Sequence, residues 1–369
     1  MNSRERVLAA LNHQPPDRVP VSLGGSAHKL SDARTLALRQ HFGLDGEPPR
    51  VLAGPSFGYY DTQLLDILDT DIRHVFLRPA DGFRTQPAAD GGRLDEWGLS
   101  YRKGALMYEL GGAPLAEATI EEIRRYPGPD PRRPELVAGL RDEARHLYET
   151  SGRAIAAYRP LYSGIFEMAQ TLRGAEKLLV ELLTEVELVE ALFERLTDIQ
   201  IGFYEVLLDA AGDYLDLVEY ADDLGAQSGP LISPKTYRRL IQPCHRRIVQ
   251  AIKARAPHVQ VMLHSCGAVR AFIPDFIEAG FDILNPIQTS AVGMLPAELK
   301  AEFGDHIVFL GGIDVQQKMR GSVEDVRQEV RRLIQDMGQG GGYVLAPAHN
   351  FGDDVPLENI LAFFEVDRR

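Results

Sequence analysis

Cysteine is scarce in this chain. Its 369 residues include only two cysteines, Cys244 and Cys266, which excludes a disulfide framework and makes a reducing cytoplasm the expected compartment. No apolar run reaches the roughly 18 residues that a membrane-spanning helix needs. The first residues, Met1 to Arg6, lack the apolar core of a secretory signal. We therefore expect a cytoplasmic protein with no membrane partner.

Positive charge is also in short supply. The chain has 40 Lys and Arg against 53 Asp and Glu, which gives a formal net charge of −13. Binding to a nucleic acid backbone requires clustered positive charge, so we expect no nucleic acid partner. Hydrophobic residues make up 44% and charged residues 25% of the chain. These are the proportions of an ordinary globular protein and exclude a disordered or fibrous one.

Short apolar segments alternate with amphipathic helical segments along most of the chain. This order predicts parallel βαβ units, and strands without polar alternation are typical of a sheet buried on both faces. We count about eight such strands and find no Pro/Gly/Ser-rich linker, so we predict one α/β domain over residues 1–369, a (β/α)8 TIM-type barrel. Residues 82–115 break the pattern with Asp95-Glu96-Trp97-Gly98 and Gly111-Gly112. They predict an antiparallel hairpin insertion after the second strand.

Polar and titratable side chains follow several of the predicted strands. In a parallel barrel the carboxyl ends of the strands meet at one rim, and catalytic residues lie there. We therefore predict a site built from these rim residues. The candidates are Arg159, Glu219, Asp222, Asp223, Gln227, His264, Cys266, Asn285, Asp314 and His349.

His264 and Cys266 form the most informative pair. They are two residues apart, so in an extended segment both side chains point to the same face, where an imidazole and a thiolate suit zinc. A catalytic zinc needs a third protein ligand. We predict His349 for this role, with a carboxylate from Glu219, Asp222 or Asp223 as the alternative. The other reading is that Cys266 is a small buried apolar residue and His264 a hydrogen-bonded core residue. Cys244 falls inside a predicted helix, and we interpret it as structural.

The adjacent acids Asp222 and Asp223 have two readings. Neighbouring residues on a strand point in opposite directions, so only one of them is expected to face the rim. Acids at such a turn also cap the next helix or pair with arginine. Amides and glycines in these loops either bind a substrate or satisfy the loop backbone. We predict catalytic roles for Asp222, Glu219 and Asp223, and substrate-binding roles for Arg159, Gln227, Asn285 and Asp314.

Several segments together resemble the uroporphyrinogen decarboxylase superfamily over nearly the whole chain. The resemblance implies a (β/α)8 barrel with its cleft at the carboxyl ends of the strands. The segments that carry it are Arg4–Leu11, Asp17–Val21, Leu172–Gly174, Asp222–Gly225, His264–Gly267 and Gly311–Asp314.

The true decarboxylases of that superfamily carry an N-terminal Arg-Gln-Ala-Gly-Arg stretch and an Asp soon after it. Here the matching stretch, residues 21–28, contains no arginine, and the next strand ends at residues 76–79 without the Asp. These departures argue against decarboxylation of uroporphyrinogen. One alternative is a decarboxylase of another carboxylated substrate, using Arg159, Arg78 and Asp222. A non-enzymatic protein that binds a metal, a corrinoid or a tetrapyrrole is another.

The chain most resembles the corrinoid-dependent methyltransferases of the superfamily. His264 and Cys266 match two of the zinc ligands of those members that act on thiols, whereas their third ligand, a late cysteine, is missing and His349 stands near its place. The resemblance implies zinc-dependent methyl transfer between a small methylated ether, amine or thiol and a corrinoid. Zinc would act as a Lewis acid, while Asp222 or Glu219 would protonate a leaving group or orient His264. The chain lacks an Asp-x-His-x-x-Gly motif, so the corrinoid is expected on a separate small protein, and a homodimer is also expected.

Overall fold

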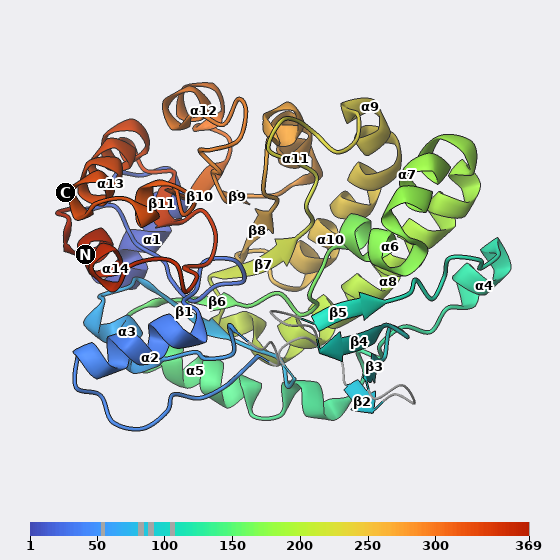
Figure 1. Cartoon of the computed structure of the whole chain (residues 1–369), viewed down its shortest axis with the longest axis horizontal. Helices are drawn as coiled ribbons and strands as arrows, with labels where there is room; N and C mark the ends of the chain where they lie inside the picture. The colour runs from blue at the N-terminus through green and yellow to red at the C-terminus, as the bar shows by residue number, and fades with distance from the viewer. Residues whose placement is uncertain (53–55, 80–84, 88–91, 104–107, 369) are drawn as a thin grey trace.

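A parallel sheet of seven strands forms the centre of the molecule, in the order β1-β6-β7-β8-β9-β10-β11. The computed structural model describes residues 1–52, 56–79, 85–87, 92–103 and 108–368. Figure 1 shows the sheet curling, with helices around its outer face. The predicted α/β architecture with a parallel sheet is confirmed. The strands are β1 Ile72–Val75, β6 Ala154–Ala157, β7 Leu217–Ala221, β8 Gln260–His264, β9 Ile283–Asn285, β10 Val308–Ile313 and β11 Tyr343–Pro347.

An extended N-terminal segment joins the two edges of this sheet. The amide of Leu345 in β11 donates to the carbonyl of Pro20 (2.9 Å), and the amide of Ser22 donates back to Leu345 (2.9 Å). On the other side, the Asp71 amide next to β1 donates to the carbonyl of Val21 (2.8 Å), and the Asp71 carboxylate accepts from the Val21 amide (2.8 Å). The extended segment at residues 20–22 thus lies between β11 and β1, the last and first strands of the sheet.

Helix α1 (Ser3–Leu11) covers the amino ends of the strands. Its Val7 and Leu11 pack against alternate strand residues such as Ile72 and Leu217 in a fully apolar cluster. Arg4 of this helix forms an ion pair with the carboxylate of Asp216, at 2.9 Å, which holds the helix against the sheet. Because side chains on a strand alternate between faces, the residue two positions after each of these apolar side chains also points into the sheet's interior. The lower interior is therefore filled with apolar side chains, and the upper interior holds the residues that follow them.

The outer helices owe their positions to apolar side chains at helical spacing. Helix α13 (Val323–Met337) begins with a capping box between Ser322 and Asp325. It buries Val326, Val330 and Leu333 against β10 and β11. The other helices have these bounds: α2 Asp32–His41, α3 Thr62–Ile67, α4 Ile120–Arg125, α5 Leu140–Thr150, α6 Ile165–Arg173, α7 Ala175–Thr184, α8 Val186–Ala211, α9 Pro234–Thr236, α10 Gln242–Arg255, α11 Ile273–Ala279, α12 Pro296–Phe303 and α14 Leu357–Glu365.

A second sheet follows β1, and it is antiparallel, as the sequence predicts for this insertion. Its turn depends on Asp95, whose carboxylate accepts from the amides of Trp97 (2.9 Å) and Leu99 (2.8 Å) and from the hydroxyl of Tyr101 (2.7 Å). Of the predicted insertion, residues 82–84, 88–91 and 104–107 lie outside the described part of the chain. The strands are β2 Thr85–Pro87, β3 Arg93–Asp95, β4 Ser100–Lys103 and β5 Tyr108–Gly111.

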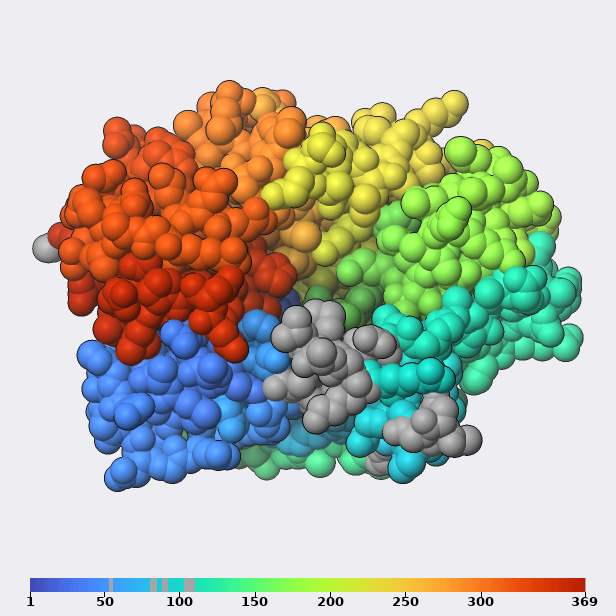
Figure 2. All heavy atoms as spheres, in the orientation of Figure 1, coloured from blue at the N-terminus to red at the C-terminus, as the bar shows by residue number. Residues whose placement is uncertain are grey.

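The surface is hollowed on one face of the molecule. Figure 2 shows a hollow at the centre of one face, between the C-terminal segments coloured red and the helices coloured green. Among the described residues, no helix combines the length and the apolar character needed to cross a membrane. Near the termini, the Val19 amide donates to the carbonyl of Arg368 (2.9 Å), so the end of the chain packs beside the segment that joins the sheet edges.

Candidate functional site

Three side chains with metal-binding atoms meet at the carboxyl ends of β7 and β8. They are Asp223, His264 and Cys266, which we call the mouth cluster, and their ligand atoms lie within 4.8 Å of one another. The register of the two strands pairs Ala221 with His264, so the residues that follow each strand are neighbours. His264 is buried, whereas Asp223 and Cys266 are half-buried. The predicted pair His264 and Cys266 is thus brought together, and a carboxylate joins it.

The orientation of the His264 ring is fixed by Asn285. The Asn285 side-chain nitrogen donates to the carbonyl of Leu310 (3.0 Å), which turns its oxygen toward His264 Nδ1 at 2.6 Å. Nδ1 therefore carries the proton, and Nε2 presents a lone pair. Nε2 faces Asp223 Oδ1 at 3.7 Å. Two acceptor atoms that face each other at this separation suit a cation between them, so the donor set fits a zinc-class ion.

Cys266 makes two contacts with the same carboxylate. Its Sγ donates to Asp223 Oδ2 (3.3 Å), and its amide donates to Asp223 Oδ1 (2.8 Å). Burial raises the pKa of the Cys266 thiol well above its usual range, and the negative charge of Asp223 raises it further. A cation in the cluster would act in the opposite direction, because it stabilises the thiolate. The site is therefore electrostatically incomplete without positive charge.

Glycines place the two loops of the mouth cluster against each other. A Cβ at Gly267, where φ is +85°, would collide with the backbone of Gly225, and a Cβ at Gly225 would press on the carbonyl of Cys266. Both positions exclude larger residues for steric reasons. The Asp-Asp-Leu-Gly and His-Ser-Cys-Gly segments are thus two halves of one backbone contact.

Asp222 points away from the mouth cluster. Its carboxylate accepts from the amides of Phe166 (3.1 Å) and Glu167 (3.0 Å) at the start of α6, and from His245 Nε2 (2.9 Å). The side chain is fully buried. Negative charge at a helix N-terminus satisfies free amides and opposes the helix dipole. The capping role that the sequence left open is the one seen here, and Asp223 is the acid that faces the mouth.

Glu219 lies deeper, with two histidines. Its Oε1 is 3.2 Å from His74 Nε2, and its Oε2 accepts from the Ser26 amide at 2.9 Å. His28 completes a group whose ligand atoms lie within 4.8 Å of one another; its Nε2 is 2.9 Å from the hydroxyl of Ser22. We call His28, His74 and Glu219 the lumen cluster. Burial alone would raise the pKa of Glu219, but the hydrogen bonds from His74 and the Ser26 amide lower it to about 2, so the group is ionised.

The two histidines of the lumen cluster were missed by the sequence reasoning. His74 is two residues after Ile72, which the structure places in the lower apolar layer, so period-two alternation puts His74 inside once the side of Ile72 is known. His28 lies outside the regular strands, so no such periodicity applies to it. Burial, the largest effect, lowers the pKa of His28 to about 3, which keeps its imidazole neutral.

His349 lies beside the mouth cluster but is not part of it. Its ring centroid is 6.5 Å from that of His264, and its side chain is exposed. Partial desolvation in the site and the neighbouring His264 lower the pKa of His349. The member that joins His264 and Cys266 in the compact group is Asp223. His349 stands at the open side of the site.

Positive charge borders the site through Arg159. Its guanidinium carbon lies 5.1 Å from the ring centre of Tyr162 and 5.9 Å from that of Tyr158. Its Nε is buried and has no hydrogen-bond partner within the described part of the chain. Lys29 donates to the hydroxyl of Tyr158 (3.0 Å) on the same side. This arrangement suits a negatively charged or carbonyl-bearing ligand. Glu167 is a further residue here that the sequence did not single out: burial, Asp223 and Asp222 raise its pKa.

The remaining predicted binding residues are occupied within the protein. Gln227 is exposed and donates to Gln316 (3.1 Å), while its oxygen accepts from Gln288 (2.7 Å). Asp314 accepts from the Gln316 amide (2.8 Å) and so stabilises its own turn. Asn285 orients His264, as described above. Gln227 therefore bonds to other loop side chains, Asp314 bonds to its own turn, and Asn285 has a positioning role.

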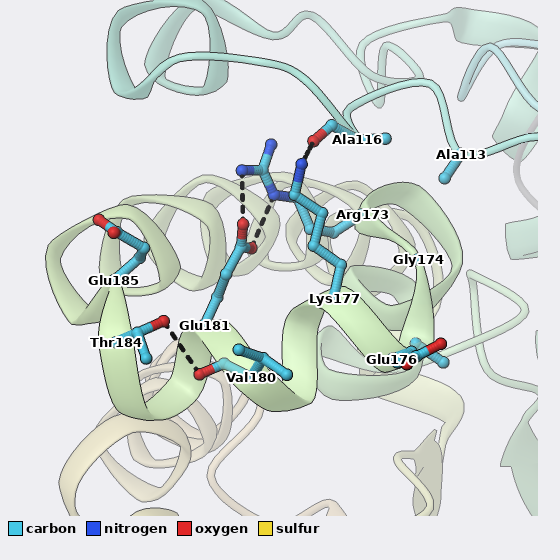
Figure 3. A pocket seen from close by; sticks show the side chains of 11 residues that line it. Ala113, Ala116, Arg173, Gly174, Glu176, Lys177, Val180, Glu181, Thr184 and Glu185 are labelled. Atoms are coloured by element: carbon cyan, nitrogen blue, oxygen red, sulfur yellow. Dashed lines mark hydrogen bonds and ion pairs between the residues drawn. The ribbon is translucent and has the colours of Figure 1, made fainter.

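The Leu172–Gly174 segment lies elsewhere, beside a groove on α7. Figure 3 shows the Arg173 guanidinium facing the carboxylate of Glu181, with two hydrogen bonds of 2.8 Å each. Arg173 also donates to the carbonyl of Ala118 (3.0 Å), which ties the segment after the insertion to α6 and α7. The groove shares no lining residue with the mouth or lumen cluster. This segment therefore supports the fold.

Comparisons with known proteins point to a family. The sequence profile described as "Uroporphyrinogen decarboxylase (URO-D)" matches residues 113–369. A methylcobamide:CoM methyltransferase of Methanosarcina barkeri is 26% identical over 370 residues, which cover 97% of this chain and 95% of that protein. A methylated-thiol–coenzyme M methyltransferase of Methanosarcina mazei is 26% identical over 245 residues, which cover 66% of this chain. That second match spans 58% of the relative's own length.

A solved structure resembles the whole chain. It is described as a methyltransferase from Methanosarcina mazei, and the two superpose with a TM-score of 0.65 at 18% identity, covering 98% of this chain and 97% of that one. At this level of identity the likeness concerns the fold. It agrees with the parallel sheet and its surrounding helices.

Proposed function

Because the chain belongs to the uroporphyrinogen decarboxylase family, we propose that it is a methyltransferase of that family, which moves a methyl group between a small methylated substrate and a corrinoid. The names of the relatives support methyl transfer. The observation that carries the proposal is the mouth cluster, in which a thiol, an imidazole and a carboxylate converge within 4.8 Å. The substrate is an ether, an amine or a thiol, and the corrinoid is carried by a separate small protein.

We assign the metal to the mouth cluster. His264 Nε2, Cys266 Sγ and the carboxylate of Asp223 would hold a zinc ion, and His349 would border its open position. Zinc, when bound, polarises a methyl-bearing heteroatom or keeps a thiol acceptor ionised at neutral pH. Asn285 holds His264 in the tautomer that leaves Nε2 free.

Arg159 is proposed to orient the substrate. Its guanidinium has an unpartnered buried Nε and lies beside Tyr158 and Tyr162. A negatively charged or carbonyl group on the substrate would hydrogen-bond there, while the reacting heteroatom lies toward Cys266. Tyr158 also holds Lys29, which adds positive charge to the same wall.

The N-terminal loop distinguishes this proposal from decarboxylation. Residues 21–28 contain no arginine, and they direct Ser26 and His28 toward Glu219. A substrate rich in carboxylates would need positive charge at that position. We further propose that the sheet and the segment 19–23 form a closed (β/α)8 barrel. The cytoplasmic location, the single domain and the homodimer stay predictions.

The test is turnover of methylcobalamin by the zinc-loaded protein with added thiols or amines as methyl acceptors. Loss of methylcobalamin absorbance measures the rate. We expect Cys266→Ala to lower the rate at least about 100-fold, because the ligand and its metal are lost together. The matched control is Cys244→Ala: Cys244 lies buried in α10, away from the cluster, and its removal should leave the rate within about twofold, with about 1 kcal/mol lost in stability. Equal rates for Cys266→Ala and wild type would contradict the proposal.

A further inference from the structure

The lumen cluster has the composition of a metal site, although it lies outside the mouth cluster. Two imidazoles and one carboxylate bring their ligand atoms within 4.8 Å of one another. His28 is 0% exposed, and His74 and Glu219 are each 1% exposed. Two histidines with one glutamate form a common set of protein ligands for zinc.

Unsatisfied polar atoms surround the cluster. Among the residues that the structure describes, no hydrogen-bond partner faces the buried Nδ1 of His28, the buried Nδ1 of His74 or the buried hydroxyl of Ser26. Buried polar atoms of native proteins are nearly always paired, so several orphans in one place indicate a missing partner. A bound ion would reorient these rings and supply part of that pairing.

The backbone leaves room at the cluster. A Cβ built at Gly25 would collide with both His28 and the Glu219 carboxylate. The backbone of Gly25 is not left-handed, so its lack of a side chain serves the close approach of the loop to the cluster. The hydroxyl of Ser22 lies 2.9 Å from His28 Nε2 and offers an oxygen atom as a fourth ligand.

From this geometry we propose that His28, His74 and Glu219 form a second divalent-cation site, separate from the mouth cluster and selective for zinc-class ions. Its nitrogen and oxygen ligands contrast with the thiol at the mouth. The three ligands come from the loop after the extended N-terminal segment, from β1 and from β7. The ion would thus tie residues 28 and 74, which precede the family-matched region 113–369, to the sheet within it.

Metal content tests the proposal without reference to activity, so its outcome is independent of the proposed methyl transfer. After reconstitution with Zn²⁺ and removal of loose ions, wild type should retain about two equivalents. Cys266→Ala should retain about one, and so should Glu219→Gln and His74→Asn. His306→Ala, a change at an exposed histidine outside both clusters, is the matched control and should retain about two.

Cobalt(II) substitution identifies which site is filled. We expect the Co²⁺-loaded Glu219→Gln protein to keep the thiolate-to-cobalt charge-transfer band, and the Cys266→Ala protein to lose it while retaining d–d bands from nitrogen and oxygen ligands. The Cys266→Ala measurement leaves the lumen cluster unaltered, so it stands even if the lumen variants fail to fold. A Cys266→Ala protein that holds no metal, or a folded Glu219→Gln protein with the metal content of wild type, would overturn the proposal.

Discussion

The mouth cluster and the lumen cluster share strand β7, but their other members come from different parts of the chain. Glu219 is two residues before Ala221, which pairs with His264, so the clusters occupy successive levels of the interior. At the mouth, two of three members come from one segment, Cys266 is half-buried and a sulfur atom is present. In the lumen, three separate segments contribute, and all members are buried. The comparison teaches that ligand spacing in the sequence reveals a site only where one segment supplies most of it.

The largest effect should come from the acid behind the mouth. Asp222→Ala removes a buried partner of His245 and the acceptor for the first amides of α6, so we expect a loss of about 3–5 kcal/mol in the free energy of unfolding. Asp223→Ala, at the half-buried neighbour, should cost about 1 kcal/mol or less while removing metal from the mouth. Urea titrations of the metal-free proteins measure both. Similar losses for the two variants would contradict the assignment of a structural role to Asp222 and a metal-binding role to Asp223.

A change at Gly25 tests whether the lumen cluster depends on close packing. Gly25→Ala places a methyl group against His28 and Glu219, and such overpacking should lower stability by about 1–3 kcal/mol. Gly229→Ala is the control, since a Cβ there meets nothing within 4 Å. Thermal unfolding at fixed protein and metal concentration compares them. If Gly25→Ala unfolds at the wild-type temperature, the loop is not tightly packed against His28 and Glu219.

Asn285 offers a test of orientation at the mouth alone. Asn285→Ala removes the acceptor that holds the Nδ1 proton of His264, and loss of such a supporting contact typically weakens metal binding by about 10–100-fold. Competition with a chromophoric chelator measures the affinity of the mouth. Asn285→Asp, which retains an oxygen acceptor, should recover most of it. An unchanged affinity in Asn285→Ala would mean that another group sets the tautomer.

The smallest effect concerns the reactivity of the thiol. In the metal-free protein burial and Asp223 raise the pKa of Cys266, so the thiolate fraction near neutral pH is below that of an ordinary cysteine, and alkylation should accelerate as the pH rises past 9. Asp223→Asn removes the negative charge and should raise the alkylation rate at pH 8 by about threefold to tenfold. The rate of iodoacetamide labelling at Cys266, located by peptide mass analysis, measures this. A slower rate in Asp223→Asn would contradict the electrostatic explanation.

The sequence predicted the parallel sheet from the alternation of apolar strands with amphipathic helices and the antiparallel insertion from its turn residues. The family resemblance is confirmed. The sequence did not decide between Asp222 and Asp223. Strands buried on both faces carry no polar alternation, so nothing in Leu217–Ala221 tells which parity faces inward. It also missed His28, because a loop has no period. In the sheet, His74 stood next to Arg73, and two adjacent polar residues on a short strand conceal which one lies inside.

Helix α1 closes the amino ends of the strands, and this affects the order in which ligands bind. Helix α1 fills that end of the sheet with Val7 and Leu11. Access to the interior is therefore left to the opening at the carboxyl ends of the strands. In the proposed reaction, a substrate held beside Cys266 and a bulky protein-borne corrinoid would share that opening. The substrate would therefore have to bind before the corrinoid protein and leave after it, because the docked corrinoid protein would block the opening. This order of binding and release requires no moving lid, because a single opening is enough to impose it.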